Sequence, residues 1–555
     1  MSHDRDALYV GLRGSALLNN SRLNKGSAFT EQERLDFGLE GLLPHHVSTL
    51  EEQLTVVVEN FRTRAAAIDK YVYLRALQDR NETLFFAALT ANLAEMMPIV
   101  YTPTVAQAVE RFSHIFRSAR GLYITPEDVD RMDLVLHNAA IGEAAVIVCT
   151  DNEGILGIGD QGTGGMAIPI GKLALYVAVG GFSPEQCLPI CLDVGTDNEV
   201  LLQDPMYLGV RAPRLRGDAY EEFIDAFVQG VKRCAPRAVL QWEDFSRDKA
   251  FDNLMRYREQ LPSFNDDIQG TTAVTVAALM GAAEAAGRPF TEEVVCIIGA
   301  GGAGVGVADG VSVALQAEGL TAQQAARQVL VFDRRGLLVE NREDLAEYKR
   351  LVATPVEIAA AFPDHSLPGV IEAVRPTALI GLSGTPGAIT EQAARLMASC
   401  TERPAIFPMS NPTSKAEACP ADLLEWTDGR AIIATGSPFD PVTRGGRTYQ
   451  FSQANNVYIF PGVGLGASVS RARAISPGMI VAAARRLHQL TEPQDYAGGL
   501  VLPPVHDLRA IAAEVAAATI AVAVEEQLAP PETMTDATSL RDSMYIPRYR
   551  PYLPA

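Results

Sequence analysis

Apolar residues recur at helical spacing through the N-terminal part of the chain. In LEEQLTVVVENF (residues 50–61) and KYVYLRALQDRNETLFFAALTANLAEMM (residues 70–97) they return every three or four positions. This period is typical of amphipathic helices that bury one face. A break follows at MPIVYTPTV, where prolines flank Tyr101 on both sides. The pattern predicts a helical N-terminal region that ends in a proline-stiffened turn.

The second half of the chain has a different pattern, in which short apolar runs alternate with Ala-rich helical segments. The apolar runs are VVCIIGAG, QVLVFDRR, TALIGLSG, PAIFPMSN and AIIATGSP, and a last Ala-rich helix is expected at about residues 505–527. Such alternation predicts a parallel, doubly wound sheet. Between the two halves, residues 144–205 mix strands with glycine-rich turns, and residues 218–262 carry helix signals. The predicted fold class is therefore α/β.

Composition narrows the range of partners. The chain has 555 residues, with 47 basic and 67 acidic side chains and a net charge of −20, so it has no basic surplus to displace counterions from nucleic acid or an anionic membrane. Its seven cysteines include no CxxC pair, which argues against a disulfide framework or a zinc site. The start, MSHDRDALYV, lacks the pattern of a signal peptide. We expect a cytoplasmic protein.

A glycine-rich turn marks the start of the doubly wound region. In EEVVCIIGAGGAGVGVADGV the motif GAGGAG follows an apolar strand and opens a helix. Gly299 would permit the tight turn, Gly301 would let the backbone approach a pyrophosphate, and Gly304 would allow close helix–strand packing. The alternative is a purely structural turn, but the flanking strand and helix favour a dinucleotide. We expect a Rossmann-like domain here.

The next strand supplies a candidate for the ribose. It ends in VFDRR, and an acid such as Asp333 at this point favours the free ribose hydroxyls of NAD. Arg334 and Arg335 follow directly and could instead accept the 2′-phosphate of NADP. The sequence favours NAD and leaves NADP open.

Two acidic pairs lie in apolar frames just before this domain. Glu243 and Asp244 stand in LQWEDF, and Asp266 and Asp267 stand in SFNDDIQGTTAVTV. Burying such adjacent carboxylates without a cation would be costly. One isolated pair is best explained by helix caps or salt bridges, but two pairs indicate a divalent cation. Oxygen ligands without His or Cys suit Mg²⁺ or Mn²⁺, which beside a nicotinamide would polarise a hydroxyl or carbonyl oxygen.

Lys172 and Tyr101 are candidates for proton transfer. Lys172, in GMAIPIGKLALY, lies between an apolar, strand-like segment and a helix, where desolvation and nearby cations would bring its pKa toward neutrality. The alternatives are an ordinary lysine at a helix N-terminus and, for Tyr101, a packed core aromatic. The local sequence does not decide between them.

Taken in order, these segments resemble those of malic enzymes. The resemblance starts at RLNKGSAFT and GLEGLLP and continues through RNETLFF, MPIVYTPTV, ILGIGDQGTGGMAIPIGKLALY, LPICLDVGTDN, DPMYLGVR, QWEDF, FNDDIQGT, IIGAGGAGVG, MSNPTSKAEA, ATGSPFDPV and NNVYIFPGVGLG. It implies a helical N-terminal region, a malic-type catalytic domain, a Rossmann-like NAD-binding domain and a C-terminal tail. We place these at residues 1–80, 81–270, 271–530 and 531–555.

The resemblance also implies a reaction: oxidative decarboxylation of (S)-malate to pyruvate and CO₂, with reduction of NAD and dependence on Mg²⁺ or Mn²⁺. Lys172 would take the proton of the C2 hydroxyl, Tyr101 would protonate C3 of enolpyruvate, and Asp266 would help to set the charge of Lys172. The implied metal ligands are Glu243, Asp244 and Asp267. The implied partners of the substrate carboxylates are Asn411, Asn455 and Asn456.

Two further expectations concern the cofactor and the assembly. Asn411 follows the predicted strand AIFPMS, and open α/β sheets bind ligands at the carboxyl ends of their strands. We therefore expect Asn411 to face the cofactor as well as the substrate. The resemblance implies a homodimer or homotetramer, assembled through the N-terminal helices.

One position departs from the family pattern. Malic enzymes that oxidise malate usually carry an arginine that grips the substrate where this chain has Gly154, in TDNEGILGIGDQG. Malolactic enzymes, which convert malate to lactate with bound NAD and Mn²⁺, tend to have glycine there. YTPTV and GDQGTGGMAIPIG resemble the oxidative branch. We expect oxidative decarboxylation first, malolactic chemistry second and an inactive NAD-binding sensor last.

Overall fold

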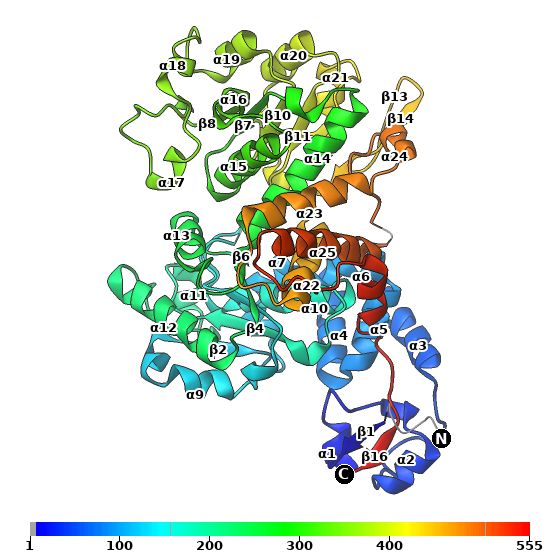
Figure 1. The fold of residues 1–555 in the computed structure, drawn as a ribbon. Helices are drawn as coiled ribbons and strands as arrows, with labels where there is room; N and C mark the ends of the chain where they lie inside the picture. The colour runs from blue at the N-terminus through cyan, green and yellow to red at the C-terminus, as the bar shows by residue number, and fades with distance from the viewer. Residues whose placement is uncertain (1–6, 156, 506) are drawn as a thin grey trace.

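The computed structural model of the protein describes residues 7–155, 157–505 and 507–555. Figure 1 shows two α/β layers, one above the other, with a helical lobe beside the lower layer and both ends of the described chain at the foot of that lobe. Within the described residues no single helix is long and apolar enough to span a membrane. One helix pair, Glu82–Ala91 with Leu93–Glu110, meets the length and composition criteria, but only across a bend of 119°.

The predicted helical N-terminal region is confirmed. Its helices are α3 (Leu50–Arg62), α4 (Ala67–Arg80), α5 (Glu82–Ala91) and α6 (Leu93–Val100). α3 begins with a capping box in which Thr49 and Glu52 satisfy each other's backbone N–H groups. Phe61, Leu74 and Leu89 turn inward and are fully buried, as the apolar spacing predicts.

The two ends of the chain meet in a small parallel ladder between β1 (Leu8–Val10) and β16 (Tyr552–Pro554). Tyr552 packs edge-on against Phe29, with ring centroids 6.1 Å apart. Lys25 Nζ lies 3.7 Å from the centroid of the Tyr552 ring and 2.5 Å from Glu33 Oε1. The C-terminal tail therefore returns to the first segment of the chain and packs there.

The lower layer contains a five-stranded sheet in the order β2-β4-β3-β5-β6, and all its strands are parallel. The strands are β2 (Leu122–Ile124), β3 (Val146–Thr150), β4 (Cys187–Leu192), β5 (Val239–Trp242) and β6 (Ser263–Asn265). Alternate residues of β3 enter different cores. Val146 and Val148 share a cluster with residues of α10 (Ala167–Ala178), and Ile147 shares another with residues of α12 (Asp218–Cys234). Helices on both faces explain why β3 is apolar at successive positions.

The upper layer contains a second sheet in the order β11-β10-β7-β8-β9. Its strands are β7 (Val295–Ile298), β8 (Val329–Asp333), β9 (Gly336–Leu337), β10 (Ala378–Gly381) and β11 (Ala405–Pro408). β9 runs antiparallel to β8, and the other pairs are parallel. The chain passes from β7 to β8 on one side and returns to β10 on the other, so the carboxyl end of β7 is a topological switch point. The predicted doubly wound sheet is confirmed.

The last predicted apolar run, AIIATGSP, forms only the two-residue strand β12 (Ala434–Thr435). It pairs with β15 (Ser452–Gln453) instead of extending the sheet by a full ladder, and a single bridge joins Ile432 to Ala405. The chain leading into β12 nevertheless follows the direction of β11, since the bridge between Ile432 and Ala405 is parallel.

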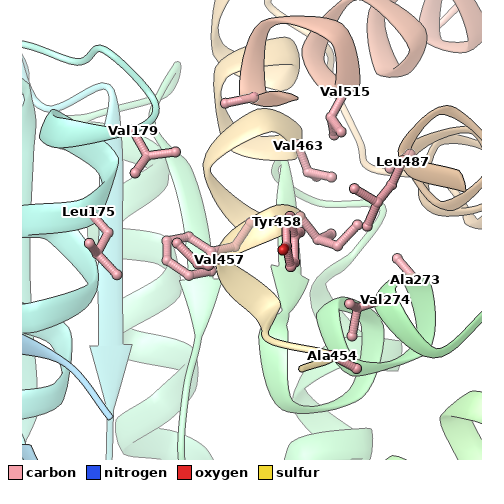
Figure 2. Packing of buried hydrophobic residues seen from close by; sticks show 14 of the residues in the cluster. Leu175, Val179, Ala273, Val274, Ala454, Val457, Tyr458, Val463, Leu487 and Val515 are labelled. Atoms are coloured by element: carbon pink, nitrogen blue, oxygen red, sulfur yellow. The ribbon is translucent and has the colours of Figure 1, made fainter. Parts of the chain in front are cut away.

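Four helices pack between and beside the sheets. They are α14 (Thr271–Ala285), α22 (Phe460–Ser470), α23 (Pro477–Gln489) and α25 (Leu508–Glu525), the last of which confirms the predicted Ala-rich helix. Figure 2 shows Val463 and Val515 meeting where α22 and α25 pack together. A Cβ at Gly462 would lie 2.7 Å from the Cβ of Val515, so this close approach requires glycine.

One local prediction was wrong. The segment GMAIPIG before Lys172 is helical, not strand-like, and belongs to η5 (Gly162–Met166) and α10. All twelve residues of α10 are buried, because the helix lies between the lower sheet and the N-terminal helices. A helix that is covered on every side has no polar face, so its apolar run cannot be told from a buried strand by period alone.

Candidate active site

The two acidic pairs are brought together by strand register. Trp242 at the end of β5 pairs with Asn265 at the end of β6, so the residues that follow each strand emerge side by side at the carboxyl edge of the lower sheet. One carboxylate oxygen from each of Glu243, Asp244 and Asp267 lies within 4.8 Å of the others. The structure thus groups the three predicted metal ligands.

The backbone conformation of Asp244 helps to hold this cluster together. Its φ of 55° lies in the left-handed region, which aspartate tolerates better than most residues. Its N–H donates to Asp267 Oδ2 at 2.7 Å. Burial raises the pKa of Asp267 to about 6, and burial also raises the pKa of Glu243 well above its usual value. Two acids that resist ionisation, close to the third carboxyl group of Asp244, form a set of donors in need of a cation.

Lys172 lies in the middle of α10 and is 1% exposed. Its ammonium contacts Asp266 and lies 2.7 Å from Glu243 Oε1. Burial acts to lower the pKa of Lys172, but the carboxylates of Asp266 and Glu243 outweigh it and raise the pKa well above its usual value. The prediction of a near-neutral pKa for Lys172 is therefore wrong for the metal-free protein, because the charges around its ammonium are anionic. The proximity of Lys172 and Asp266 is as expected.

Tyr101 stands directly after α6 and is 7% exposed. Lys172 Nζ lies 5.5 Å from the centroid of its ring, and Phe460 packs edge-on against it at 6.5 Å. Burial raises the pKa of Tyr101 well above its usual value. A phenol that keeps its proton beside an ammonium and two acids is placed to deliver that proton to a ligand.

A chain of hydrogen bonds behind the carboxylates involves residues that sequence reasoning missed. Tyr176 OH donates to Gln241 Oε1 at 2.6 Å, and Gln241 Nε2 donates to Glu243 Oε2 at 2.8 Å. All three residues are buried. Gln241 and Glu243 lie two positions apart and point to the same face. The sequence feature that could have revealed Gln241 is a polar residue within the apolar run VLQW.

The three predicted asparagines have different partners. Asn456 Nδ2 donates to Asp266 Oδ2 at 3.0 Å, which joins it to the cluster of Lys172 and the carboxylates. Asn455 caps η10 (Asn456–Tyr458) by accepting from the Val457 N–H. Asn411 Oδ1 accepts from Ser437 Oγ at 2.6 Å.

Asn411 is linked to the lower layer through its backbone. A Cβ at Gly157 would lie 3.3 Å from the carbonyl oxygen of Asn411 and 2.6 Å from Cδ of Pro412. The loop after β11 therefore packs against the loop after β3, so two strand ends, one from each sheet, face the same region.

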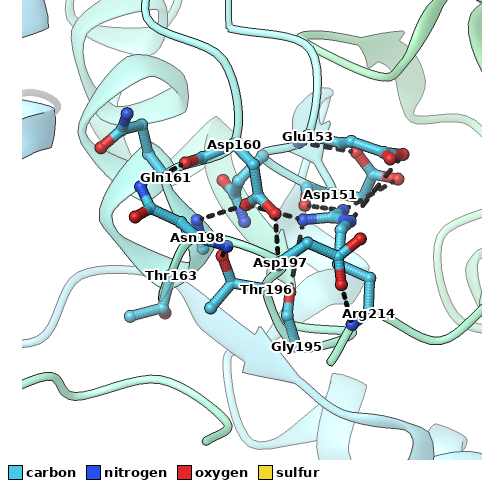
Figure 3. A network of polar contacts seen from close by, with 12 residues as sticks. Asp151, Glu153, Asp160, Gln161, Thr163, Gly195, Thr196, Asp197, Asn198 and Arg214 are labelled. Atoms are coloured by element: carbon cyan, nitrogen blue, oxygen red, sulfur yellow. Dashed lines mark hydrogen bonds and ion pairs between the residues drawn. The ribbon is translucent and has the colours of Figure 1, made fainter. Parts of the chain in front are cut away.

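An arginine that sequence reasoning missed holds the loop after β3 in place. Arg214 is buried, its Nη2 donates to the Asp151 carbonyl oxygen at 2.6 Å, and its Nη1 lies 3.0 Å from Asp160 Oδ1. Figure 3 shows Arg214 surrounded by Asp151, Glu153 and Asp160. Burial raises the pKa of Asp151. The sequence feature that indicates such an arginine is the excess of acids in TDNEGILGIGD, which needs a counter-charge from elsewhere in the chain.

Gly154 lies in this loop, and its N–H donates to the carbonyl oxygen of Asp244 at 2.8 Å. A Cβ at this position would be 2.1 Å from the carbonyl oxygen of Phe245. The surroundings of Gly154 therefore fit a glycine and not the arginine of the family pattern, because the backbone of residues 244–245 occupies the space that a side chain at position 154 would need.

The glycine motif has the geometry of a dinucleotide turn. α15 (Gly302–Ala317) begins directly after Gly301. Gly299 has a φ of 115°, and a Cβ there would lie 2.4 Å from the carbonyl oxygen of Leu382, the residue after β10. A Cβ at Gly304 would lie 1.8 Å from the carbonyl oxygen of Gly299. This glycine turn thus lies at the topological switch point, and its close contacts are possible only because glycine has no side chain.

Asp333 ends β8 and is held by cations. Arg342 Nη2 lies 2.9 Å from Asp333 Oδ2, and Lys349 Nζ lies 3.6 Å from the same oxygen. Burial acts to raise the pKa of Asp333, but the bonds from Arg342 and from the Arg335 N–H hold it below its usual value. An ionised acid therefore stands at the strand end where a ribose would lie.

Fold and site together define a dinucleotide-binding α/β enzyme with an acidic cation site. Two domain models match: malic enzyme, N-terminal domain over residues 78–258, and malic enzyme, NAD binding domain over residues 268–524. The chain belongs to the malic enzyme family, which confirms the resemblance found in the sequence.

Individual relatives agree with this assignment. The chain is 46% identical to the NAD-dependent malic enzyme of Shewanella sp. (strain MR-4) over 100% of its own length and 99% of the relative. It is also 46% identical to the NAD-dependent malic enzyme of Aeromonas hydrophila subsp. hydrophila, over 99% of its length and 98% of the relative. The solved malic enzyme of Entamoeba histolytica shares the fold, with a TM-score of 0.57 at 24% identity over 91% of this chain and 90% of that one.

Proposed function

We propose that the protein is an NAD-dependent malic enzyme that oxidatively decarboxylates (S)-malate to pyruvate and CO₂. The observation that carries the proposal is the buried group of Lys172, Asp266 and Glu243 beside Tyr101, at the edge where the loops of both sheets meet. The names of the two relatives that match over nearly the whole chain favour this oxidative reaction over malolactic chemistry.

Glu243, Asp244 and Asp267 would hold Mg²⁺ or Mn²⁺. Their clustered oxygens fit a hard cation, and Asp266 Oδ1 is buried with no hydrogen-bond partner in the part of the chain that the structure describes. The cation, when bound, supplies Lewis-acid charge to the substrate oxygen, and NAD supplies the hydride acceptor. Glu243 cannot compensate both a cation and the Lys172 ammonium with one charge, so we expect cation binding to lower the proton affinity of Lys172.

The residues of the chain itself would carry the proton transfers. Lys172 takes the proton of the C2 hydroxyl, with Asp266 fixing its position. Tyr101, protonated because it is buried, gives a proton to C3 of enolpyruvate after CO₂ leaves. The amides of Asn411, Asn455 and Asn456 hydrogen-bond the substrate carboxylates. Of these, Asn456 is the one already tied to Asp266.

Gly299, Gly301 and Gly304 would receive the pyrophosphate of the cofactor, and Asp333 would face the ribose, with Asn411 nearer the nicotinamide. An ionised Asp333 supports NAD. Ion pairs with Arg342 and Lys349 help to keep the Asp333 carboxylate ionised.

We also propose the remaining features of the protein. Its functional units are the regions 1–80, 81–270, 271–530 and 531–555, in which the third binds the cofactor. It works in the cytoplasm as a homodimer or homotetramer. Sedimentation of the purified protein measures the assembly directly.

The test is an assay with (S)-malate, Mn²⁺ and either NAD or NADP, in which reduced nicotinamide is followed by absorbance and pyruvate and lactate are measured separately. We expect pyruvate and NADH in equal amounts, with NAD preferred. Lactate without net NADH would make the protein a malolactic enzyme. Binding of NAD without turnover of malate would make it a sensor.

A further inference from the structure

A cavity lies at the opposite edge of the upper sheet from the cofactor turn. It has a volume of about 300 Å³ and is walled by segments 429–433, 447–451 and 496–501 together with Arg403. Arg403 precedes β11 and Arg430 precedes β12, whereas Asn411 follows β11. In Figure 1 the hairpin of β13 (Val442–Arg444) and β14 (Arg447–Tyr449) stands beside α24 (Pro493–Gly498) on this flank. The cavity is therefore distinct from the dinucleotide site.

Three arginines line this cavity: Arg403, Arg430 and Arg447. Among the described residues none of them has an ion pair, and no acid lines the cavity. Their described hydrogen bonds go to backbone carbonyl oxygens: Arg430 Nη1 donates to Ala398 at 2.9 Å, and Arg447 Nη2 donates to Ala497 at 3.4 Å.

The guanidinium groups of Arg403 and Arg447 repel each other. Burial lowers the pKa of Arg403, and the nearby charges of Arg447 and Arg288 lower it further. Arg288 is neutralised by Glu293 at 2.9 Å. Glu402 offsets part of the charge of Arg403, but among the described residues it forms no ion pair with any of the three lining arginines. In a chain with 67 acidic and 47 basic residues, three arginines without an ion pair around one cavity concentrate positive charge locally, which attracts an anion.

The other walls are apolar and aromatic. Tyr449, Phe451, Tyr496 and Leu500 line the cavity, and the guanidinium of Arg447 lies 4.9 Å from the centroid of the Tyr449 ring. Arginines that can form paired hydrogen bonds with planar oxyanions, set against an apolar wall, are the components of a site for a small organic anion.

We propose that this cavity binds a small polyanion that bears phosphate or several carboxylates, and that its occupant alters the affinity for malate. The segment 447–451, which forms part of its wall, continues through β15 toward the active site. Phe451 lines the cavity, Ser452 begins β15, and Asn456, four residues later, donates to Asp266. Ser452 Oγ also accepts the N–H of Val501, which lines the same cavity. A ligand that shifts this wall moves the segment that carries Asn456.

Binding is measured by calorimetry on the full-length protein saturated with NAD, so that the pyrophosphate turn is already filled. The probes are inorganic pyrophosphate and propane-1,2,3-tricarboxylate, which separate phosphate from carboxylate recognition. We expect one of them to bind with one site per chain and to bind at least tenfold more weakly to Arg447→Ala and to Arg430→Gln. Arg395→Ala is the matched control, since Arg395 lies on α20 (Glu391–Cys400) of the same layer and pairs with Glu391. It should change the affinity less than twofold.

Two results would overturn the proposal. If neither probe binds, or if the probe binds Arg447→Ala as tightly as it binds the parent protein, the cavity is not an anion site. If the probe binds but the KM for malate shifts equally in the parent and in Arg447→Ala, the link to the active site is wrong. Arg447 is exposed, so its variants are expected to fold, and melting temperatures check this. The binding result stands whether or not the protein turns over malate, so it is separate from the proposed function.

Discussion

The two strand edges that face each other across the active site are built on opposite principles. At the lower sheet, the site consists of side-chain charges buried together: Lys172, Asp266 and Glu243, with Asp267 close by. At the upper sheet, the site consists of backbone made accessible by missing side chains, at Gly299 and Gly304. The first depends on electrostatic balance and the second on shape, so a single substitution should affect them in different ways.

The largest effect is expected from Lys172→Ala. It removes the proposed base, for which general acid–base catalysis suggests a loss of about 10²–10⁴-fold in kcat, and it leaves Asp266 and Glu243 without their cation. The affinity for NAD, measured by fluorescence titration, should stay within about twofold because the glycine turn is untouched. Lys232→Ala, at a lysine of α12 whose ammonium donates to Gln260 Oε1 at 3.4 Å, is the control. Near-normal kcat in the alanine variant would remove Lys172 from the reaction.

The next largest effect is expected from Asp267→Asn. This change removes one of three clustered carboxylates and keeps the size of the side chain. We expect the affinity for Mn²⁺ to fall by more than the 10–100-fold typical of residues that only support metal ligands. Manganese titration followed by electron paramagnetic resonance measures it. Asp252→Asn, at an exposed acid on α13 (Arg247–Tyr257), should leave the affinity unchanged. Equal affinities in the two variants would disprove the cation site.

The glycine turn offers a matched pair that tests shape alone. A Cβ at Gly304 would overlap the carbonyl oxygen of Gly299, whereas at Gly302 the nearest atom is 3.8 Å away. Gly304→Ala should therefore weaken NAD binding by about 1–3 kcal/mol, the range for overpacking, and Gly302→Ala should change it little. Affinity for Mn²⁺ should be equal in both. If the two variants bind NAD alike, the turn is not sensitive to shape at this point.

The sequence predicted these two sites unequally. GAGGAG and the strand and helix around it are local, so the turn and its helix followed from one segment, and the doubly wound sheet followed from the alternation of apolar runs and helical segments. The acidic pairs were visible in WEDF and NDDIQ, but their meeting depends on the pairing of Trp242 with Asn265, which no local pattern encodes. The helical state of the segment before Lys172 and the anionic surroundings of its ammonium were missed for the same reason: both come from what packs around α10. Arg214 lies far along the chain from Asp151, and only the fold joins them.

The smallest effect is a pH dependence that belongs to the charged site and is absent from the glycine turn. Burial raises the pKa of Asp267 from an ordinary value of 3.8 to about 6. The folded, metal-free protein then binds this proton more tightly than the unfolded chain does. The resulting stabilisation is fully present below about pH 4 and is lost as the pH rises through about 6. Asp267 is only partly shielded from solvent, so we expect the free energy of unfolding to fall by about 1–2 kcal/mol from this source.

Urea unfolding at pH 4.5 and 7.5 should show this loss in the parent and in Gly302→Ala but not in Asp267→Asn, whose side chain does not ionise. Saturating Mn²⁺ should reverse the trend in the parent, because a bound cation favours the ionised acid. An equal pH dependence in the parent and Asp267→Asn would mean that Asp267 is not the source, and the contrast between the two edges would then have to rest on Lys172 and Glu243.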